Sequence, residues 1–397
     1  MENKIMNEFK NTIQIGAWVP ATGSEEEIKE MSEAGIEFIF AGRGDDEKLK
    51  NMLTWCEKYS VKCIIHDSRL YGNVNNENLS KETISEYIQR YIENPYVLGN
   101  SLYDEPNMKI YKNLSDVGKK YYKASSGKIP FVNLLPIYAN AEQLGIDSYK
   151  KYVEEYINNF DTDYICVDVY PLTNGNTTLP SYLENLDIMG TTARESCRDF
   201  WIFIQSMPFN NMRAPSEEDM RFQVYSCLSF GAKNILHFCY ATPASGAETF
   251  PYGMIDLNGK KTHLWYTAQK INKELKKLSP TYVKYKSLGA YSFKAGKIPD
   301  YLNFGNEYNN FDLIDNLKSD QSLLIGCFEA KEGNGKAFTL VNMSELKDKL
   351  TANISFSLKN GVKTVAYIKG DQSELKNVSG KYNISLESGE GIFITVE

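Results

Sequence analysis

The residues best suited to chemistry are two adjacent carboxylates, Asp104 and Glu105, which end the apolar run that begins at Tyr96 and are followed by Pro106. Proline cannot continue a strand ladder, so the pair stands where a strand ends. Burying a carboxylate at the end of a strand costs free energy, so such a group is usually paired with a cation or serves a function. Apolar or like-charged surroundings raise a carboxyl pKa and make it a proton donor at neutral pH. Glu105 is therefore our candidate acid, with Asp104 beside it; an ion pair between Glu105 and an arginine is the structural alternative.

Such a pair needs a scaffold, and the sequence predicts strands that alternate with helices over roughly the first 280 residues. The predicted strands are 13–19, 36–40, 61–65, 96–104, 131–135, 164–170, 200–206 and 234–240. Ser24, Ser80 and Ser216 are expected to cap the starts of three of the helices. Nearly continuous apolar strands between helices are typical of a parallel sheet with covered faces. Eight such units predict an α/β fold, a closed (β/α)₈ TIM barrel, with its active site at the C-terminal strand ends. A doubly wound open sheet is the alternative, but no glycine-rich phosphate loop follows the first strand.

After residue 280 the helical spacing disappears and short β-rich runs follow. These runs are 323–328, 337–341, 352–358, 364–368 and 391–396. They predict a small C-terminal antiparallel β-sandwich. We therefore expect a barrel domain at 1–280 and a β domain at 281–397, although residues 281–320 show no clear pattern.

Further candidate site residues gather at the predicted strand ends, and we expect them to contact a substrate. They are Trp18, Arg43, His66, Asp67, Asp168, Tyr170, Gln205 and Tyr240, together with Glu248 in a later loop. Trp18 is either a stacking platform or a plug of the barrel mouth. Arg43 either holds a polar group of the ligand or pins its own loop by pairing with Asp45 or Asp46.

Three of these candidates, Asp168, His66 and Asp67, have side chains of the types used in catalysis. Asp168 shares a face of the sixth strand with Tyr170, and it is either a functional carboxylate or a solvated turn residue. His66 and Asp67 are expected as substrate contacts rather than as the catalytic base. A hydrolase triad is not indicated, because no serine or cysteine stands in the sequence pattern of a nucleophile elbow.

Composition excludes several other classes of protein. The net charge of the 397 residues is −7 and no stretch is densely basic, so a nucleic acid partner is not expected. No apolar run reaches membrane-spanning length. The polar N-terminus lacks the apolar core of a signal peptide, so the chain is expected to be cytoplasmic as written, or exported if a leader has been removed. Oligomeric state is left open.

Cysteine and histidine usage gives no support for a metal site. The chain has seven cysteines, most of them inside apolar runs, and three histidines, with no C-x-x-C spacing. This pattern is typical of reduced core thiols, and we expect neither a metal nor a cofactor. Aromatic residues make up 13% of the chain, which suits a cleft for sugar rings but is also compatible with an ordinary core.

Several segments between residues 200 and 266 carry a family resemblance. They are Phe200-Trp-Ile-Phe-Ile-Gln-Ser, Arg213-Ala-Pro, Gln223-Val-Tyr-Ser-Cys-Leu-Ser-Phe-Gly-Ala-Lys, Gly246-Ala-Glu-Thr-Phe and Gly259-Lys-Lys-Thr. In these segments the chain resembles retaining glycoside hydrolases of the clan that includes the family 42 β-galactosidases. The resemblance implies a carbohydrate substrate and places Glu105 at the acid/base position that ends strand four.

The chain departs from that clan at two positions. Asp104 stands where the clan usually has asparagine, and Gln205 stands where the nucleophilic glutamate should end strand seven. A neutral amide cannot attack an anomeric carbon, so the ordinary mechanism with two carboxylates is not available at these positions.

Three functions remain open. The first is a glycoside hydrolase with Glu105 as acid, in which Asp168, Asp67 or Glu248 activates water or attacks the sugar. The second is a substrate-assisted N-acetylhexosaminidase, in which the acetamido oxygen attacks and Asp104 orients it. Neighbours on a regular strand point to opposite sides, so this route needs a bent or bulged strand end. The third is a non-catalytic glycan-binding barrel.

Overall fold

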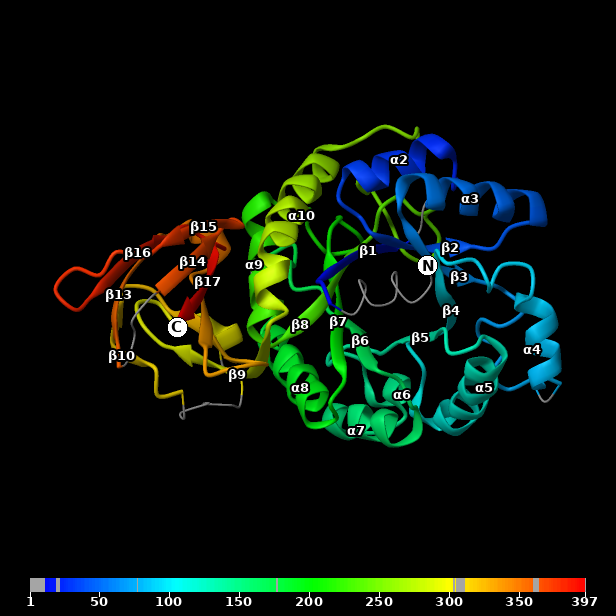
Figure 1. The fold of residues 1–397 in the computed structure, drawn as a ribbon, viewed down its shortest axis with the longest axis horizontal. Helices are drawn as coiled ribbons and strands as arrows, with labels where there is room; N and C mark the ends of the chain where they lie inside the picture. Colours follow the sequence, from blue (N-terminus) through cyan, green and yellow to red (C-terminus); the bar gives the residue numbers. More distant parts are fainter. Residues whose placement is uncertain are drawn as a thin grey trace.

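The computed structural model describes residues 11–18, 22–76, 78–175, 178–302, 304, 311–359 and 364–396. Its larger part is a barrel of eight parallel strands surrounded by helices (Figure 1). The strands are β1 (Gln14–Trp18), β2 (Phe38–Gly42), β3 (Lys62–His66), β4 (Val97–Asp104), β5 (Ile129–Asn133), β6 (Tyr164–Asp168), β7 (Asp199–Gln205) and β8 (Ala232–Phe238).

The barrel is closed between β5 and β6. The hydrogen-bonded order is β5-β4-β3-β2-β1-β8-β7-β6. A parallel bridge between Leu134 and Val167 joins the ends of β5 and β6, and the Leu134 amide donates to the Cys166 carbonyl at 2.9 Å. The predicted (β/α)₈ barrel is confirmed, and the open sheet is excluded because the two edge strands meet.

Eight helices of the described chain cover the outer face of the barrel (Figure 1). They are α2 (Glu25–Glu33), α3 (Asp46–Tyr59), α4 (Lys81–Ile88), α5 (Tyr111–Ala124), α7 (Tyr149–Asn159), α8 (Tyr182–Glu195), α9 (Glu217–Ser229) and α10 (His263–Tyr282). The short α6 (Ala141–Leu144) and η1 (Met108–Ile110) lie in loops. The predicted N-caps are confirmed, because Ser24, Ser80 and Ser216 each accept a hydrogen bond from the third residue of their helix.

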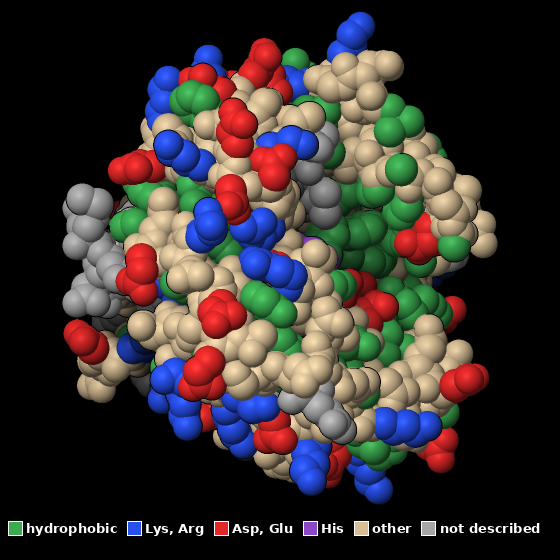
Figure 2. Space-filling view, turned by 90° about the vertical axis from the view of Figure 1, so that its right-hand side faces the viewer, with side chains coloured by type: hydrophobic (Ala, Val, Ile, Leu, Met, Phe, Trp, Pro, Cys, Tyr) green, Lys and Arg blue, Asp and Glu red, His purple; other side chains and the backbone are tan. Residues whose placement is uncertain are grey.

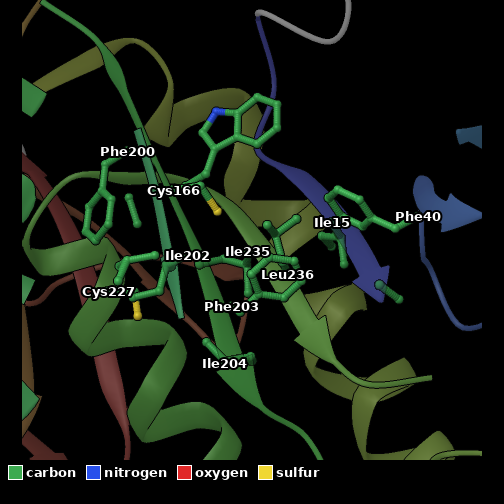
Figure 3. Packing of buried hydrophobic residues seen from close by; sticks show 14 of the residues in the cluster. Ile15, Phe40, Cys166, Phe200, Ile202, Phe203, Ile204, Cys227, Ile235 and Leu236 are labelled. Atoms are coloured by element: carbon green, nitrogen blue, oxygen red, sulfur yellow. The ribbon is translucent and has the colours of Figure 1, made fainter. Parts of the chain in front are cut away.

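Aromatic rings fill the barrel below its mouth. The Trp201 ring stacks on Tyr164 with centroids 4.3 Å apart, and Phe203 lies 5.6 Å from both Phe40 and Trp18. Figure 3 shows the packing around Phe203 and Phe40. The barrel interior is therefore a packed core rather than a channel, and this fold places its active site at the C-terminal strand ends.

The C-terminal part consists of two antiparallel sheets, which confirms the predicted sandwich. A six-stranded sheet has the order β15-β14-β17-β12-β11-β9 and a three-stranded sheet the order β10-β13-β16. Their strands are β9 (Tyr285–Phe293), β10 (Ile314–Ser319), β11 (Leu323–Ala330), β12 (Lys336–Asn342), β13 (Ala352–Leu358), β14 (Thr364–Ile368), β15 (Asp371–Glu374), β16 (Tyr382–Leu386) and β17 (Gly391–Val396). Phe338 and Phe356 lie in the buried cluster between the sheets. β9 and β10 occupy the stretch whose pattern was unclear.

Helix α9 joins the two parts of the molecule. It packs on β7 and β8 of the barrel and on β11, β12 and β17 of the sandwich. At its C-terminal end the Ser229 hydroxyl is hydrogen-bonded to the Thr339 hydroxyl at 2.7 Å. Because both of its sides are covered, residues Asp219 to Ser229 are all buried.

The chemical inventory of the described residues is simple. All seven cysteines are free thiols, and six of them are buried. In the described ranges, no group of three or more histidine, cysteine, aspartate and glutamate side chains is arranged to hold a metal ion. Within the same ranges, no helix combines the length and the apolar character that crossing a membrane requires.

Candidate active site

A cavity of about 170 Å³ lies at the C-terminal ends of the barrel strands. Its lining residues are Trp18, Asp104, Glu105, Asn133, Asp168, Tyr170, Phe203, Phe209, Phe238 and Glu248. Figure 2 shows a hollow on one face of the molecule where hydrophobic and acidic side chains lie together. A larger cavity of about 310 Å³ opens between α5 and the starts of β5, β6 and β7, and its lining contains none of the predicted site residues.

The end of β4 has the irregular geometry that brings Asp104 and Glu105 to one cavity. The pairing of β4 with β5 shifts register between Ser101 and Tyr103. Glu105 then adopts a left-handed backbone with φ of 51°, and its amide donates to the Asn133 carbonyl at 2.9 Å. A strand bulge followed by a left-handed residue re-aims the side chains, so neighbours in sequence line the same space.

Asn133, at the end of β5, links two of the carboxylates. Its Nδ2 donates to Asp168 Oδ1 at 2.7 Å and to Asp104 Oδ1 at 3.2 Å. The sequence analysis missed this residue, because Asn133 was expected inside a strand that continues to Leu135. The available signal was a lone amide within an otherwise apolar strand.

Three carboxyl groups of the cavity have raised pKa values. Loss of hydration and the negative charges of Asp104 and Glu248 raise the pKa of Glu105 to about 7, although its side chain still reaches solvent at the mouth. Burial raises the pKa of Asp104 to about 6, although the hydrogen bond from Asn133 opposes that shift. Burial, together with the charges of Glu105 and Asp104, raises the pKa of Asp168 well above its usual range. Glu105 thus holds a proton near neutral pH.

Gln205 lies outside the lining of the cavity. It is fully buried; its Oε1 accepts from the Leu172 amide at 3.0 Å and its Nε2 donates to the Arg213 carbonyl at 2.8 Å. Phe203, two residues earlier on β7, contributes to the cavity instead. The Gln205 amide therefore anchors the backbone segments that follow β6 and β7.

Arg43 and Asp67 are held in ion pairs beside the mouth. Arg43 is paired with Asp46, as the loop-pinning alternative predicted, and its Nε lies 3.7 Å from Asp67 Oδ2. Asp67 is buried and accepts from Arg69 through both carboxylate oxygens, at 2.9 and 2.5 Å. Burial alone would raise the pKa of Asp67, but the hydrogen bonds from Arg69 and Tyr91 lower it. Asp67 is thus a paired, ionised carboxylate.

Tyrosines surround the mouth at positions that the sequence analysis did not select. Tyr71 lies 3.9 Å from His66 between ring centroids, and its pKa is raised by burial and by the charges of Asp104 and Glu105. Tyr138, in the loop after β5, is 45% exposed and lies within electrostatic reach of Asp168 and Glu105. Both tyrosines follow a predicted strand by several residues, which is why a rule based on strand ends missed them.

The other predicted residues divide between the cavity and the core. Trp18 lines the cavity and packs on Phe203, so it serves as the floor of the mouth and stays available for stacking. Tyr170 also lines the cavity and makes an edge contact with Phe209 at 5.2 Å. Tyr240 lies beyond the end of β8, is fully buried, and has its hydroxyl within electrostatic reach of Glu27 of α2.

Comparison with known proteins finds similarity to glycoside hydrolases. A family model described as beta-galactosidase, glycoside hydrolase family 42, matches residues 91–278, which include Glu105, Asp168, Gln205 and Glu248. The barrel is similar to family 42 β-galactosidases. The curated relative "Beta-galactosidase BgaA" of Clostridium cellulovorans is 26% identical over 134 residues, which cover 31% of this chain and 20% of that protein. The match thus spans about a fifth of the relative's length.

Solved structures show the same kind of fold. A β-galactosidase from Bacillus circulans sp. alkalophilus superposes with a TM-score of 0.56 at 10% identity, covering 98% of this chain and 99% of that chain. A glycoside hydrolase of family 5 from Bacteroides vulgatus gives a TM-score of 0.55 at 11% identity, covering 97% and 89% respectively. At such identities the likeness shows a shared fold alone.

Proposed function

We propose that this chain hydrolyses glycosidic bonds and that Glu105 is the general acid. The observation that carries the proposal is the raised pKa of Glu105, about 7, in a cavity lined by three further carboxylates and five aromatic side chains. A protonated carboxyl can protonate the departing glycosidic oxygen, and neighbouring carboxylates stabilise the oxocarbenium-like centre. Aromatic rings offer flat apolar faces to the C–H groups of a sugar.

The test is a screen of aryl glycosides followed by substitution of the acid. We expect Glu105→Gln to lower kcat on the best substrate about 100- to 10,000-fold, because the proton donor is lost while shape is kept. Glu332→Gln, at an exposed turn of the sandwich, is the matched control and should leave turnover unchanged. Full activity in Glu105→Gln would remove Glu105 from the role of acid.

A substrate-assisted N-acetylhexosaminidase is the second candidate, because Asp104 and Glu105 line one cavity despite being neighbours in sequence. This route predicts turnover of 2-acetamido aryl glycosides and none of the corresponding simple glycosides. Asp104→Asn should then abolish turnover, since the orienting carboxylate is lost. Turnover of simple glycosides at comparable rates would reject it.

A glycan-binding barrel without turnover remains the third candidate. The presence of an amide at position 205, held by backbone groups, favours it. It predicts that a sugar binds in calorimetry while no glycoside of the screen is cleaved, and that Glu105→Gln binds that sugar as well as the wild type does.

A further inference from the structure

The carboxylate that works with Glu105 is the open question of this site, and most of the candidates are otherwise engaged. Gln205 has no charge and is bonded to backbone groups. Asp67 is paired with Arg69 on both oxygens. Asp168 is buried and bonded to Asn133, and burial together with the charges of Glu105 and Asp104 raises its pKa well above the usual range. A raised pKa favours the protonated form, and close pairing occupies the oxygens of a carboxylate, so neither Asp168 nor Asp67 is well suited to take a proton from water.

Glu248 differs from these carboxylates in its position and its exposure. It belongs to the loop that follows β8, and in the closed strand order β8 stands four positions from β4 in either direction. Glu105 and Glu248 therefore come from opposite sides of the barrel mouth. Glu248 is exposed to solvent yet lines the same cavity as Glu105, and its charge acts on Glu105.

A clamp between two loops, made by Asn210 with Glu248 and Thr249, holds this carboxylate. Asn210 Nδ2 donates to Glu248 Oε1 at 2.9 Å, and the Thr249 amide donates to Asn210 Oδ1 at 2.9 Å. The Asn210 amide in turn donates to the Thr249 carbonyl at 2.9 Å. Asn210 has a left-handed backbone with φ of 47°, a conformation that asparagine tolerates better than most residues do.

Aromatic packing supports the clamp from below. Phe209 and Phe250, the neighbours of the clamp residues, stack at 6.4 Å between ring centroids. Phe238, the last residue of β8, lies 5.3 Å from Phe209. The two loops are thus fixed on a rigid base, and a single oxygen of Glu248 is used by Asn210.

We propose that Glu248 is the second carboxylate of the site, a base that activates water, and that Asn210 is the positioning residue that holds it opposite Glu105. This inference rests on the proposed hydrolase function. Two carboxyl groups on opposite sides of a sugar, with a water molecule between one of them and the ring, are the arrangement of inverting glycosidases.

The reaction is then a single displacement. A water molecule gives a proton to Glu248 as its oxygen bonds to the anomeric carbon from the face opposite the leaving group. The bond from the anomeric carbon to the glycosidic oxygen breaks with its electron pair moving to that oxygen, which takes the proton of Glu105. The products are a sugar of inverted configuration and a free alcohol, and solvent returns the proton from Glu248 to Glu105.

The experiment combines product stereochemistry with three variants. Proton NMR during cleavage of the best aryl glycoside should show inversion in the first product. We expect Glu248→Gln to lower kcat about 100-fold or more and Asn210→Ala to lower it about 10-fold, because the base remains but is less well placed. Asn211→Ala is the control: it lies on the same loop, its backbone carbonyl accepts from Asn174, and it should leave kcat unchanged.

Two results would overturn the assignment. The first is retention of configuration. The second is full activity of Glu248→Gln. If Asp168→Asn is inactive at the same time, Asp168 is the base instead.

A titration of Glu105 by carbon NMR separates this inference from the hydrolase proposal. Glu248→Gln should lower the pKa of Glu105, because a negative neighbour is removed, and an unchanged pKa would show that Glu248 does not face Glu105. This readout needs no substrate. If no glycoside is cleaved, the hydrolase proposal fails, and the inferred base role fails with it, while the titration still decides the placement of Glu248.

Discussion

Glu105 has both a left-handed backbone conformation and a raised pKa. A residue other than glycine at φ of 51° costs about 1 kcal/mol or more, and such outliers concentrate at functional sites. The same residue has a pKa raised to about 7, because hydration is reduced and Asp104 and Glu248 are negative. The strained conformation holds the acid beside the charges that keep it protonated.

The raised pKa predicts how activity depends on pH. A general acid works in its protonated form, so kcat/KM should fall as the pH rises through about 7, where Glu105 loses its proton. Asp104→Asn removes one negative neighbour, which favours ionisation of Glu105 and should move this descending limb to lower pH. The measurement is the pH profile of kcat/KM for the wild type and for Asp104→Asn. The apparent pKa of its descending limb belongs to the interacting carboxyl groups together. A limb at the same pH in Asp104→Asn would contradict the proposed cause.

At the scale of elements, the ends of β4 and β7 have opposite roles. β4 ends in a bulge that directs two carboxylates into the cavity. β7 ends in Gln205, whose amide accepts from Leu172 and donates to Arg213. Gln205, at the position that the resemblance assigns to the nucleophile, therefore anchors the loop that leaves β7. A carboxylate at this position would meet surroundings that accept a hydrogen bond from Nε2.

Gln205→Glu should therefore destabilise the protein rather than create a nucleophile. The substitution places a carboxylate oxygen where Nε2 now meets the Arg213 carbonyl at 2.8 Å, in a fully buried position. We expect a loss of about 3 kcal/mol in the free energy of unfolding at pH 8. The loss should shrink as the pH falls from 8 towards about 4, because burial raises the pKa of the new carboxyl above its unfolded value of about 4.3 and the protonated form carries no charge. Urea denaturation measures it, with the exposed Gln372→Glu as control; a gain of hydrolysis with retained configuration would contradict this prediction.

At the scale of the whole molecule, the sandwich packs against the barrel through α9 at close range. A Cβ on Gly326 of β11 would lie 2.6 Å from the Ser229 carbonyl oxygen, and one on Gly391 of β17 would lie 2.6 Å from Tyr225 Cβ. Tyr282 adds ring contacts with Phe328 and Phe393 at 5.6 and 5.5 Å. The sandwich thus supports the helix between β7 and β8, the two strands whose following loops form the clamp.

Gly391→Ala tests this support. The added methyl group overlaps atoms close to the backbone of α9, so neighbours have to shift, and we expect a loss of about 1–3 kcal/mol in the free energy of unfolding. Gly42→Ala, where a Cβ would meet no atom within 4 Å, is the control. Urea denaturation followed by tryptophan fluorescence provides the measurement. Equal stability of the two variants would show that the contact between the sandwich and α9 accommodates the methyl group without loss of free energy of unfolding.

The sequence alone was sufficient for the architecture. Strand and helix alternation predicted the barrel, and serines at 24, 80 and 216 predicted helix starts, because these signals act within a few residues of chain. Strand ends shifted by one or two residues, and β8 ends at Phe238 rather than Tyr240. That shift placed Tyr240 among the predicted contacts, whereas the structure buries it in the core.

The sequence also suggested the proposed chemistry, because two adjacent carboxylates before a proline at a strand end are a candidate acid site. Only the tertiary structure decided which groups meet it. Asn133, Tyr138 and the clamp of Asn210 with Glu248 come from loops and strands far apart in sequence. Their meeting depends on barrel closure and on a bulge in β4. The raised pKa values of Asp104, Glu105 and Asp168 likewise depend on burial and on neighbours that no local pattern encodes.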